Sequence, residues 1–297
     1  MEKKLVSILI PVYNRLSLVS QTIESAINQT HRNIEIIICD NCSTDGTWKL
    51  LQNCCLKDNR IRIFRNETNI GPVKNWKRCI DEARGQYAKI LYSDDLIDEN
   101  FIEETMKVFD NRTAFVLSMV KTFNGNQITD FSIYKKKAEY LTSDYYRNIL
   151  LNNPNGFPVS PGCALFRTLD LKLSLIIDIP NTLSLDFNRL GAGNDLLLFL
   201  NTANRYPHIK VVNCTTAFFR SHNESFTTTN NLDVYYDFAK YYFIKNNKPA
   251  FLSIFKTYLW YREKRDKEKK TILRLIEGKK DFLFLFRFIL KNIARRF

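Results

Sequence analysis

Two adjacent carboxylates, Asp94 and Asp95, directly follow a run of mostly apolar residues from Tyr87 to Tyr92. The length of the run predicts a strand, and in an open α/β sheet ligands bind at the carboxyl ends of strands. Two neighbouring acids repel each other without a counter-charge, and a hard divalent cation takes oxygen ligands of this kind. Because a phosphate is the natural partner of such a cation, the pair predicts a phosphate-binding metal site.

A structural interpretation of these acids is also open. Residues 98–109 have helical spacing, and acids near the first turn of a helix stabilise it, so residues 93–95 could serve only as a helix cap. Asp195 has a similar position, because it follows the turn formed by residues 191–194 at the start of a strongly apolar helix. Taken alone, neither position identifies a function.

Apolar runs and helical patterns alternate in the chain ahead of the acid pair. We expect strands at residues 5–13, 34–39, 61–64 and 87–92, helices at 16–29, 48–55 and 73–83, and then a helix near 100–109 and a strand near 114–120. The second run is rich in Ile and apolar on both faces, as a buried parallel strand requires. This alternation predicts a parallel sheet that is covered by helices and connected by right-handed crossovers.

The composition sets bounds on the class of protein. The 297 residues suffice for one large domain, or for one domain with an appendage. A hydrophobic content of 45% is ordinary for a globular protein and argues against disorder. The formal net charge of +13 favours an acidic partner: nucleic acid, an anionic membrane surface or a phosphorylated substrate. Seven scattered cysteines, an odd number, fit reduced thiols better than a disulfide framework.

The amino terminus has basic residues followed by an apolar run, as a signal peptide does. The run is only about six residues long, and Pro11 ends it without a small-residue cleavage site, so we interpret it as the first strand. No stretch reaches the roughly 18 uninterrupted apolar residues of a transmembrane helix. These features predict a cytoplasmic protein.

The last part of the chain differs from the rest. Aromatic residues crowd the segment from Tyr235 to Phe243, and residues 261–297 contain 13 Lys or Arg against 5 Asp or Glu. Near the end, Arg287, Lys291 and Arg295 recur at i, i+4 and i+8 among Phe, Leu and Ile. This pattern is typical of a helix in a membrane interface, where each basic residue adds about 1 kcal/mol of attraction to anionic lipid. Packing of the segment on the domain core is the alternative.

Several features form an ordered series at one edge of the predicted sheet. They are Pro11-Val12-Tyr13-Asn14 ending the first strand, Asp40 ending the second, Asn69-Ile70-Gly71 after the third, and Ser93-Asp94-Asp95 after the fourth. With Asn194-Asp195 and the motif Arg220-x-His222-x-x-Ser225-x-Thr227, the series resembles family 2 inverting glycosyltransferases of the GT-A fold. The resemblance is close over residues 5–110, thinner over 160–230 and absent after that.

The resemblance implies an α/β GT-A fold, which is a Rossmann-like, mostly parallel sheet flanked by helices. Residues 1–230 would form the glycosyltransferase domain, with a nucleotide-binding half at 1–110 and an acceptor-binding half at 111–230. Residues 231–297 lie beyond the resemblance, and their composition predicts a helical, aromatic and basic C-terminal region that associates with a membrane.

The resemblance also implies a role for each matching residue. The nucleotide-binding residues would be Pro11, Val12, Tyr13, Asn14, Asp40, Asn69, Gly71 and Asp94. Asp40 would accept a hydrogen bond from the base, and Gly71 would permit close backbone approach. Asp95, with Asp94 and His222, would hold Mn²⁺ or Mg²⁺ against the diphosphate of the donor. Asp195 would be the base that deprotonates the acceptor hydroxyl.

Two residues depart from the family pattern. Tyr92 stands where many relatives have the first acid of the metal motif, so metal binding would rest on Asp95, with Asp94 nearer the ribose or a water. Asn194 replaces the Glu of the family's Glu-Asp pair, which leaves Asp195 as the only acid there and Asp186 as the next candidate for the base.

The implied activity is transfer of a sugar from a nucleotide diphosphate, with a UDP-sugar favoured, to a saccharide acceptor. The basic tail favours a lipid-linked acceptor and a peripheral position on the inner face of the cell membrane. Such an enzyme would act in the synthesis of O-antigen, capsule or another surface polysaccharide.

Three other classes of protein compete with this interpretation. Cys39-Asp40-Asn41-Cys42 is a C-x-x-C sequence, but a redox motif opens a helix at its first cysteine, whereas Cys39 lies within a predicted strand. Nucleic-acid binding would explain the charge, yet the basic excess is concentrated in the tail and most aromatic residues lie in apolar runs. A metal-dependent nucleotidyltransferase also needs carboxylates, but usually a Gly-rich phosphate loop as well, which is missing near the first strand.

Overall fold

Strands and helices alternate from residue 6 to residue 90, as the apolar runs predict. In a computed structural model the order is β1 (Val6–Val12), α1 (Val19–Ile27), β2 (Ile34–Asp40), α2 (Thr47–Lys57), β3 (Ile61–Arg65), α3 (Pro72–Glu82) and β4 (Tyr87–Ile90). The structure describes residues 4–124, 127–130, 138–151, 157–221 and 232–265. Each of these strands and helices confirms an expected element, with ends that differ by a few residues.

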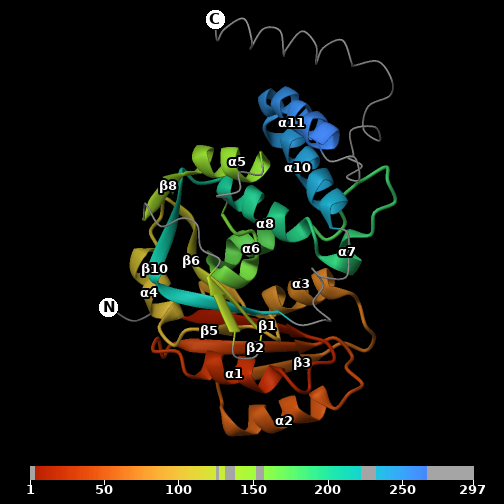
Figure 1. The fold of residues 1–297 in the computed structure, drawn as a ribbon. Coiled ribbons are helices and arrows are strands. Elements are labelled where there is room, and N and C mark those ends of the chain that lie inside the picture. The colour runs from red at the N-terminus through yellow and green to blue at the C-terminus, as the bar shows by residue number, and fades with distance from the viewer. Residues whose placement is uncertain (1–3, 125–126, 131–137, 152–156, 222–231, 266–297) are drawn as a thin grey trace, which may run out of the picture.

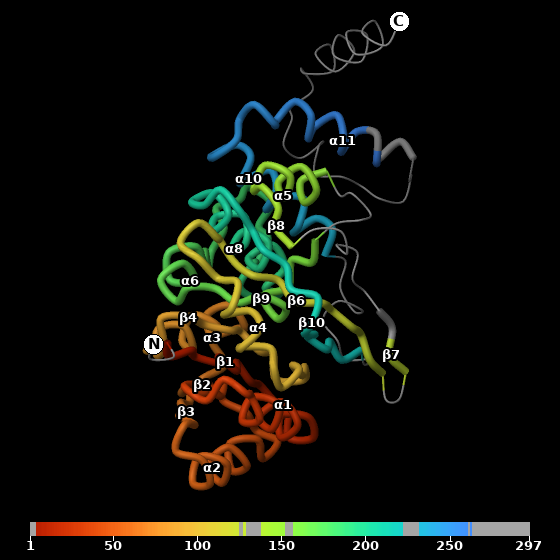
Figure 2. Tube along the Cα trace, turned by 90° about the vertical axis from the view of Figure 1, so that its left-hand side faces the viewer, coloured from red at the N-terminus to blue at the C-terminus, as the bar shows by residue number. Residues whose placement is uncertain are grey.

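The first four strands form a parallel sheet in the order β3-β2-β1-β4. Every residue of β1 and β2 is buried, which is the reason for their continuous apolar sequence. Helices α1 and α2 lie on one face of this sheet and α3 lies on the other (Figures 1 and 2). On α3, Val73, Trp76 and Ile80 are buried at i, i+3 and i+7, so one stripe of the helix packs on the strands.

The second half of the chain extends the same sheet. Its elements are β5 (Leu96–Ile97), α4 (Phe101–Val108), β6 (Thr113–Asn124), β7 (Gln127–Asp130), β8 (Glu139–Leu141), α5 (Thr142–Leu150), the 3-10 turn η1 (Pro161–Cys163), β9 (Ala164–Arg167), α6 (Thr168–Ser174), α7 (Phe187–Leu190), α8 (Asn194–Ala203) and β10 (His208–Arg220). Strand β9 pairs antiparallel with both β4 and β6 and so joins the two halves. The long strands β6 and β10 pair in parallel.

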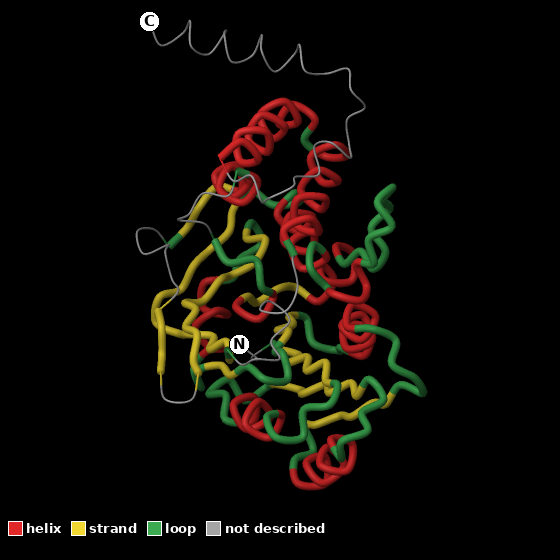
Figure 3. Tube along the Cα trace, turned by 45° about the vertical axis from the view of Figure 1, so that its right-hand side comes forward, coloured by secondary structure: helices red, strands yellow, loops and turns green. Residues whose placement is uncertain are grey.

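The complete sheet is mixed, and its longest ladders are parallel. The strand order is β3-β2-β1-β4-β9-β6-β10-β5, with β7 paired to β6 and β8 to β10. In Figure 3, which is coloured by secondary structure, the strands lie between helices. The predicted architecture, a mostly parallel sheet flanked by helices, is therefore confirmed.

The C-terminal helices are α10 (Asp233–Asn247) and α11 (Leu252–Arg265), joined by the 3-10 turn η2 (Pro249–Phe251). They lie at the end of the molecule opposite α1 and α2 (Figures 1 and 2). Phe238, Phe243 and Ile244 of α10 are buried in the main core, and the helix packs on α8. Within the described part of the chain, no helix is long and apolar enough to cross a bilayer. The tail with Arg287, Lys291 and Arg295 lies outside the described residues.

Candidate active site

The tips of β1 and β2 are held together by hydrogen bonds between their loops. The Asn14 backbone N–H donates to Ser43 Oγ at 2.9 Å, and Asn14 Oδ1 accepts from the Thr44 N–H at 2.9 Å. Asn14 has a φ of 47° and Cys42 a φ of 66°. Both values lie in the left-handed region, which costs a residue other than glycine about 1–3 kcal/mol. The surrounding hydrogen bonds therefore maintain a strained conformation at these two tips.

Several of the predicted nucleotide-binding residues come from these tips. Pro11 and Val12 are buried within β1, whereas Tyr13, directly after it, is 43% exposed. The ring of Tyr13 is thus accessible to a planar ligand. Asp40 has no exposed surface, and its Oδ2 lies 3.3 Å from Arg65 Nε. The Asp40 carboxylate can contact a base only if the protein groups around it move.

An amide network joins the end of β2 to the loop between β3 and α3. Asn41 Nδ2 donates to Asn69 Oδ1 at 2.8 Å, and Asn41 Oδ1 accepts from Asn66 Nδ2 at 3.0 Å. Asn75 of α3 completes the network, since its Oδ1 accepts from Asn66 Nδ2 at 2.9 Å and its Nδ2 donates to the Cys39 carbonyl at 2.9 Å. The network fixes Asn69 next to the tip of β2.

Gly71 allows a close approach, and the approaching group is a protein side chain. Gly71 has a φ of 85°, and a Cβ at this position would lie 2.6 Å from Asn188 Nδ2. Asn188, on α7, donates to the Ile70 carbonyl at 3.1 Å and accepts from the Lys74 N–H at 3.1 Å. These bonds fasten α7 to the N-terminus of α3.

The acid pair lies after β4, where residues from both halves of the chain contact it. Asp95 is 7% exposed, and its Oδ1 accepts from the Arg220 N–H at 2.9 Å. Arg220 Nε donates to the Asp94 carbonyl at 2.9 Å, and Arg15 Nε lies 3.6 Å from Asp94 Oδ2. Arg15 follows β1 and Arg220 ends β10. The acid pair is therefore clamped between the first strand and the last strand.

The chemistry of the acid pair fits a hard divalent cation. Two adjacent carboxylates provide oxygen donors, and burial together with the charge of Asp94 raises the pKa of Asp95 well above its usual value. A bound cation would offset this repulsion. Among the described residues, no three His, Cys, Asp or Glu side chains gather into a metal-binding group. His222, the third predicted ligand, lies outside those residues.

A buried lysine adds positive charge near the acid pair. Lys89 of β4 has no exposed surface, and its Nζ donates to the Gly162 carbonyl and lies 4.6 Å from the centre of the Phe101 ring. Burial lowers the pKa of Lys89 to about 7, while the charges of Cys163 and Asp95 act to raise it. In turn, the positive charge of Lys89 lowers the pKa of Asp95, so this buried lysine favours the ionised form of the acid.

Asp195 begins α8 and accepts three hydrogen bonds. Its Oδ1 accepts from the backbone N–H groups of Leu196 at 2.7 Å and Gly193 at 2.9 Å, and its Oδ2 accepts from the Tyr236 hydroxyl at 2.8 Å. Burial raises the pKa of Asp195 to about 6, although the hydrogen bonds lower it. The residue is nevertheless only half-buried, so part of it remains accessible. A carboxylate with this pKa is mostly ionised at neutral pH and can accept a proton.

Tyr92 connects the two acidic positions. Burial, followed by the charges of Asp195 and Asp95, raises the pKa of the Tyr92 phenol well above its usual value. Both acids therefore lie within electrostatic reach of one side chain. The ring of Tyr92 packs on Trp76 of α3 with 5.6 Å between the ring centroids. The residue that departs from the family pattern thus lies near both acids.

The other two residues of interest near Asp195 have structural partners. Asn194 is buried, and its Nδ2 donates to the carbonyls of Ile176 and Ile177 at 2.7 and 2.8 Å. Asp186 is exposed and caps α7 by accepting from the Arg189 N–H at 3.0 Å. A helix cap explains Asp186 without a catalytic role.

Three side chains at these acids were not predicted from the sequence: Arg15, Lys89 and Tyr236. Lys89 could have been noticed as the one charged residue inside the apolar run of residues 87–92. Arg15 follows the predicted site residues Tyr13 and Asn14 directly. Tyr236 is one of several tyrosines in an aromatic segment, and no local pattern distinguishes it from its neighbours.

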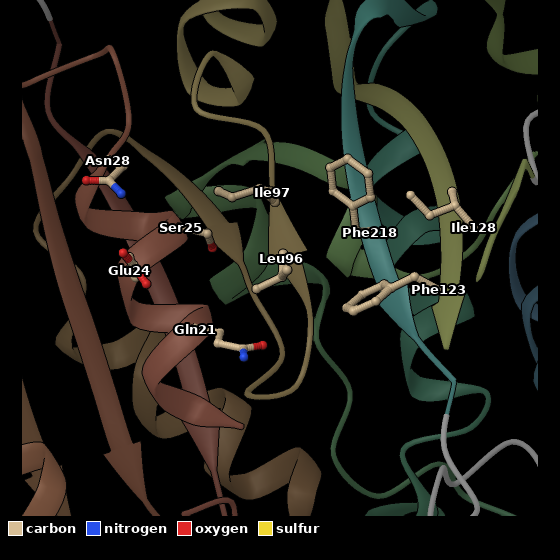
Figure 4. A pocket seen from close by; sticks show the side chains of 9 residues that line it. All are labelled: Gln21, Glu24, Ser25, Asn28, Leu96, Ile97, Phe123, Ile128 and Phe218. Atoms are coloured by element: carbon tan, nitrogen blue, oxygen red, sulfur yellow. The ribbon is translucent and has the colours of Figure 1, made fainter. Parts of the chain in front are cut away.

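A groove of about 640 Å³ lies between α1 and the strands of the second half (Figure 4). Polar side chains from one face of α1 line one wall, and apolar side chains from β5, β6, β7 and β10 line the other. The lining residues are Gln21, Glu24, Ser25, Asn28, Leu96, Ile97, Phe123, Ile128 and Phe218. None of the predicted site residues in the described part of the chain lines this groove, but it adjoins the acid pair through Arg220, which donates to Gln21 Oε1 at 2.6 Å and whose guanidinium lies 4.4 Å from the centre of the Phe123 ring.

A comparison with protein families matches residues 7–172 to the family described as glycosyl transferase family 2. The matched segment contains the first four strands, their loops and the acid pair. The chain belongs to glycosyltransferase family 2, and the resemblance found in its sequence is confirmed.

Curated relatives match parts of the chain. It is 39% identical over 112 residues to the UDP-Glc:alpha-D-GlcNAc-diphosphoundecaprenol beta-1,3-glucosyltransferase WfaP of Escherichia coli. This match covers 36% of this chain and 44% of that protein. It is 31% identical over 226 residues to an Escherichia coli chondroitin synthase, covering 70% of this chain and 32% of that protein. The chain therefore spans less than half the length of these two relatives.

Solved structures share the fold. Residues 1–349 of TarS from S. aureus, in complex with UDP-GlcNAc, superimpose with a TM-score of 0.68 at 19% identity, over 94% of this chain and 77% of that chain. At this identity the likeness concerns the fold alone. It confirms the predicted α/β GT-A architecture.

Proposed function

We propose that the chain is an inverting glycosyltransferase that moves a sugar from a nucleoside diphosphate, UDP in the first instance, to a saccharide acceptor. Membership of glycosyltransferase family 2 supports the reaction class. The name of WfaP gives a UDP-Glc donor and a diphosphoundecaprenol-linked acceptor for that relative, and TarS binds UDP-GlcNAc. By analogy, the acceptor here is lipid-linked and the product is a surface polysaccharide such as O-antigen or capsule.

The observation that best supports this proposal is that Trp76 packs against the segments that carry both acids. Its ring centroid lies 5.6 Å from that of Tyr92, three residues before Asp95, and a Cβ on Gly191, four residues before Asp195, would lie 2.6 Å from the Trp76 ring. An inverting transfer requires the leaving diphosphate and the attacking hydroxyl to lie on opposite faces of the sugar ring. The base for the hydroxyl and the group that offsets the charge of the diphosphate must therefore lie on opposite sides of the same sugar. The acid pair would serve the diphosphate and Asp195 the hydroxyl.

In the proposed reaction the acceptor oxygen bonds to the anomeric carbon as the bond from that carbon to the diphosphate oxygen breaks. The leaving diphosphate keeps the bonding electron pair, and Asp195 takes the proton of the acceptor hydroxyl. A cavity of about 260 Å³ is bordered by Leu196 and Tyr236, the two neighbours of Asp195 in α8 and α10. We propose that the acceptor approaches the base from the side of this cavity, whose lining includes these two neighbours but not Asp195 itself.

The donor nucleotide would bind across the tips of β1, β2 and β3. The exposed ring of Tyr13 would stack on the base, over a floor of Pro11 and Val12, with Asn14 at the edge. Asp40, Asn69 and Gly71 would border the same pocket. We propose that Mn²⁺ or Mg²⁺ binds Asp94, Asp95 and His222, where it would neutralise charge on the diphosphate.

We also propose that the protein is cytoplasmic and peripheral on the inner face of the membrane, attached by the basic tail of residues 279–297. In this arrangement residues 1–230 form the glycosyltransferase domain, divided at residue 110 into nucleotide and acceptor halves. Residues 231–297 form the C-terminal region. The contact between Tyr236 and Asp195 links this region to the acceptor half.

The proposed function is tested with Asp195→Asn and the matched variant Asp186→Asn. We expect D195N to lose transfer from a UDP-sugar by roughly 10²- to 10⁴-fold, because the hydroxyl loses its proton acceptor. Binding of UDP with Mn²⁺, measured by thermal shift, should remain, since the donor binds at other loops and a ligand that binds only the folded state stabilises it. D186N should retain transfer, because Asp186 caps a helix on the surface.

Full activity of D195N would mean that another residue is the base. If no nucleoside diphosphate stabilises the protein, the proposed class of donor is wrong.

A further inference from the structure

Asp195 contacts a residue of helix α10, and both partners lie beyond the family-matched segment. That segment ends at residue 172, and α10 begins at Asp233. Tyr236 of α10 donates its hydroxyl to Asp195 Oδ2 at 2.8 Å. Burial and the charge of Asp195 raise the pKa of Tyr236 well above its usual value, so the phenol keeps its proton and remains a donor.

The two oxygens of Asp195 have different surroundings. Oδ1 accepts two backbone N–H groups, those of Leu196 and Gly193, whereas the one donor to Oδ2 among the described residues is the Tyr236 hydroxyl. A carboxylate oxygen can accept a hydrogen bond along each of two lone-pair directions. The two backbone amides occupy both directions of Oδ1, whereas the Tyr236 hydroxyl occupies one direction of Oδ2 and leaves the other available to a ligand. The Tyr236 hydroxyl determines where that remaining direction points.

The position of Tyr236 is itself fixed by packing on both sides of α10. A Cβ on Gly193 would lie 3.1 Å from both the Tyr235 carbonyl and Ala239 Cβ, so α10 packs directly on the turn that precedes Asp195. On the other side, Arg262 Nη1 of α11 donates to Asp237 Oδ1 at 3.1 Å. The helix is therefore held between α8 and α11, and the phenol cannot move without disturbing these contacts.

Within the described part of the chain, three tyrosines on other elements interact electrostatically with Asp195. They are Tyr92 after β4, Tyr145 of α5 and Tyr236 of α10, and each has a pKa raised well above its usual value, chiefly by burial. All three stay neutral near pH 7. Burial raises the pKa of Asp195 and its hydrogen bonds lower it, and among these bonds the one from Tyr236 lowers the pKa most.

We infer that Tyr236 is a positioning residue for the transfer reaction, and that its hydroxyl aims the remaining lone pair of Asp195 Oδ2 at the acceptor hydroxyl. The inference rests on the proposed role of Asp195 as the base. In the step, the proton of the acceptor passes to Oδ2, the acceptor oxygen bonds to the anomeric carbon, and the nucleoside diphosphate leaves with its electron pair. Tyr236 keeps its own proton throughout.

The test is Tyr236→Phe, which retains the ring and removes only the hydroxyl. We expect kcat to fall roughly 10- to 100-fold, the range expected when a hydrogen bond to a charged group is lost, with the KM for the UDP-sugar unchanged. The acid limb of the pH–rate profile should move to higher pH, because Asp195 without this bond is protonated more easily and is active only when ionised. A role in stability alone would not move this limb.

The matched control is Tyr235→Phe, which removes a hydroxyl from the same helix. The ring of Tyr235 packs on Phe187 with 5.2 Å between ring centroids. It should leave both kcat and the acid limb unchanged. In the double variant D195N/Y236F, the loss of the phenol should have no further effect on the residual rate. Normal kcat and an unmoved acid limb in Y236F, together with an inactive D195N, would overturn the inference. An active D195N would instead reject the proposed base, so the two failures are distinguishable.

Discussion

Burial raises the pKa of both Asp95 and Asp195. The groups around the two acids differ, however, and so does the chemistry that each acid can perform. Asp95 lies beside Asp94, so a like charge adds to the effect of burial. Asp195 lies among tyrosines that stay neutral, one of which donates to it. Active sites commonly assign different tasks to two acids through such differences in surroundings. The first arrangement attracts a cation, and the second leaves a carboxylate that can accept a proton.

Lys89 allows a prediction about stability and pH. Its pKa falls from ~10.4 in an unfolded chain to about 7 in the fold, so the buried charge costs about 4 kcal/mol at neutral pH. Between these two values the unfolded chain binds more protons, and raising the pH stabilises the wild-type protein. Lys89→Met removes the charge at similar volume but leaves the Gly162 carbonyl without its donor, which costs about 1–3 kcal/mol. We expect K89M to unfold at a higher temperature than wild type at pH 6, and this advantage to shrink or reverse by pH 10.

Thermal unfolding at several pH values measures this difference. Lys49→Met, on the exposed surface of α2, is the matched control and should track the wild type at every pH. A K89M variant that is less stable than wild type already at pH 6 would show that the contacts of the ammonium with Gly162 and Phe101 outweigh its burial.

At the scale of elements, the first half of the fold could be predicted because each strand is buried on both faces. Continuous apolar sequence in β1 and β2 leaves little choice other than a central parallel strand, and Pro72 marks the start of α3. The predicted ends of these elements differ from the observed ones by a few residues, since caps and first turns depend on contacts outside the element.

The remaining features depend on contacts between residues far apart in the sequence. Strand β9 is short and pairs antiparallel between β4 and β6, a position that its four residues do not reveal. The network of Asn41 and Asn69 requires two loops to meet, and Tyr236 reaches Asp195 over a separation of 41 residues. Local patterns carry no information about such pairs, so the candidate site could be predicted as far as its strand tips and not in its partners.

The contact between α7 and the loop before α3 leads to a prediction at this scale. Gly71→Ala would introduce a Cβ 2.6 Å from Asn188 Nδ2 and would also strain a backbone with a φ of 85°. We expect a loss of about 1–3 kcal/mol in the free energy of unfolding, measured with denaturant, and weaker UDP binding. In an Asn188→Ala background the cost of G71A should be smaller, because the clash is gone, but not zero, because the strained φ remains. Equal costs in both backgrounds would mean that the loop moves away from α7 freely.

The side chain that contacts the proposed base and the excess of positive charge belong to one continuous C-terminal region. Helix α10 carries Tyr236 to Asp195 and packs in the main core, and α11 follows it at the same end of the molecule (Figure 1). Residues 261–297 then hold 13 Lys or Arg against 5 Asp or Glu. Attachment of this segment to an anionic membrane would keep the acceptor side of the enzyme close to lipid, where a lipid-linked acceptor would be presented.

Deleting residues 279–297 should therefore release the protein from membranes, as measured by flotation with vesicles that contain anionic lipid. The triple variant R287E/K291E/R295E is a sharper test, because it keeps the length and apolar residues of the segment and reverses one stripe of charge. Each basic residue near such a surface contributes about 1 kcal/mol, so losing three attractive charges should weaken binding by more than 10²-fold.

Neutral vesicles, as a control, should show a much smaller difference between wild type and the triple variant R287E/K291E/R295E. Transfer to a soluble acceptor analogue should be unaffected, since the tail is proposed to act on location only. Unchanged flotation of both variants would mean that this segment is not the membrane anchor.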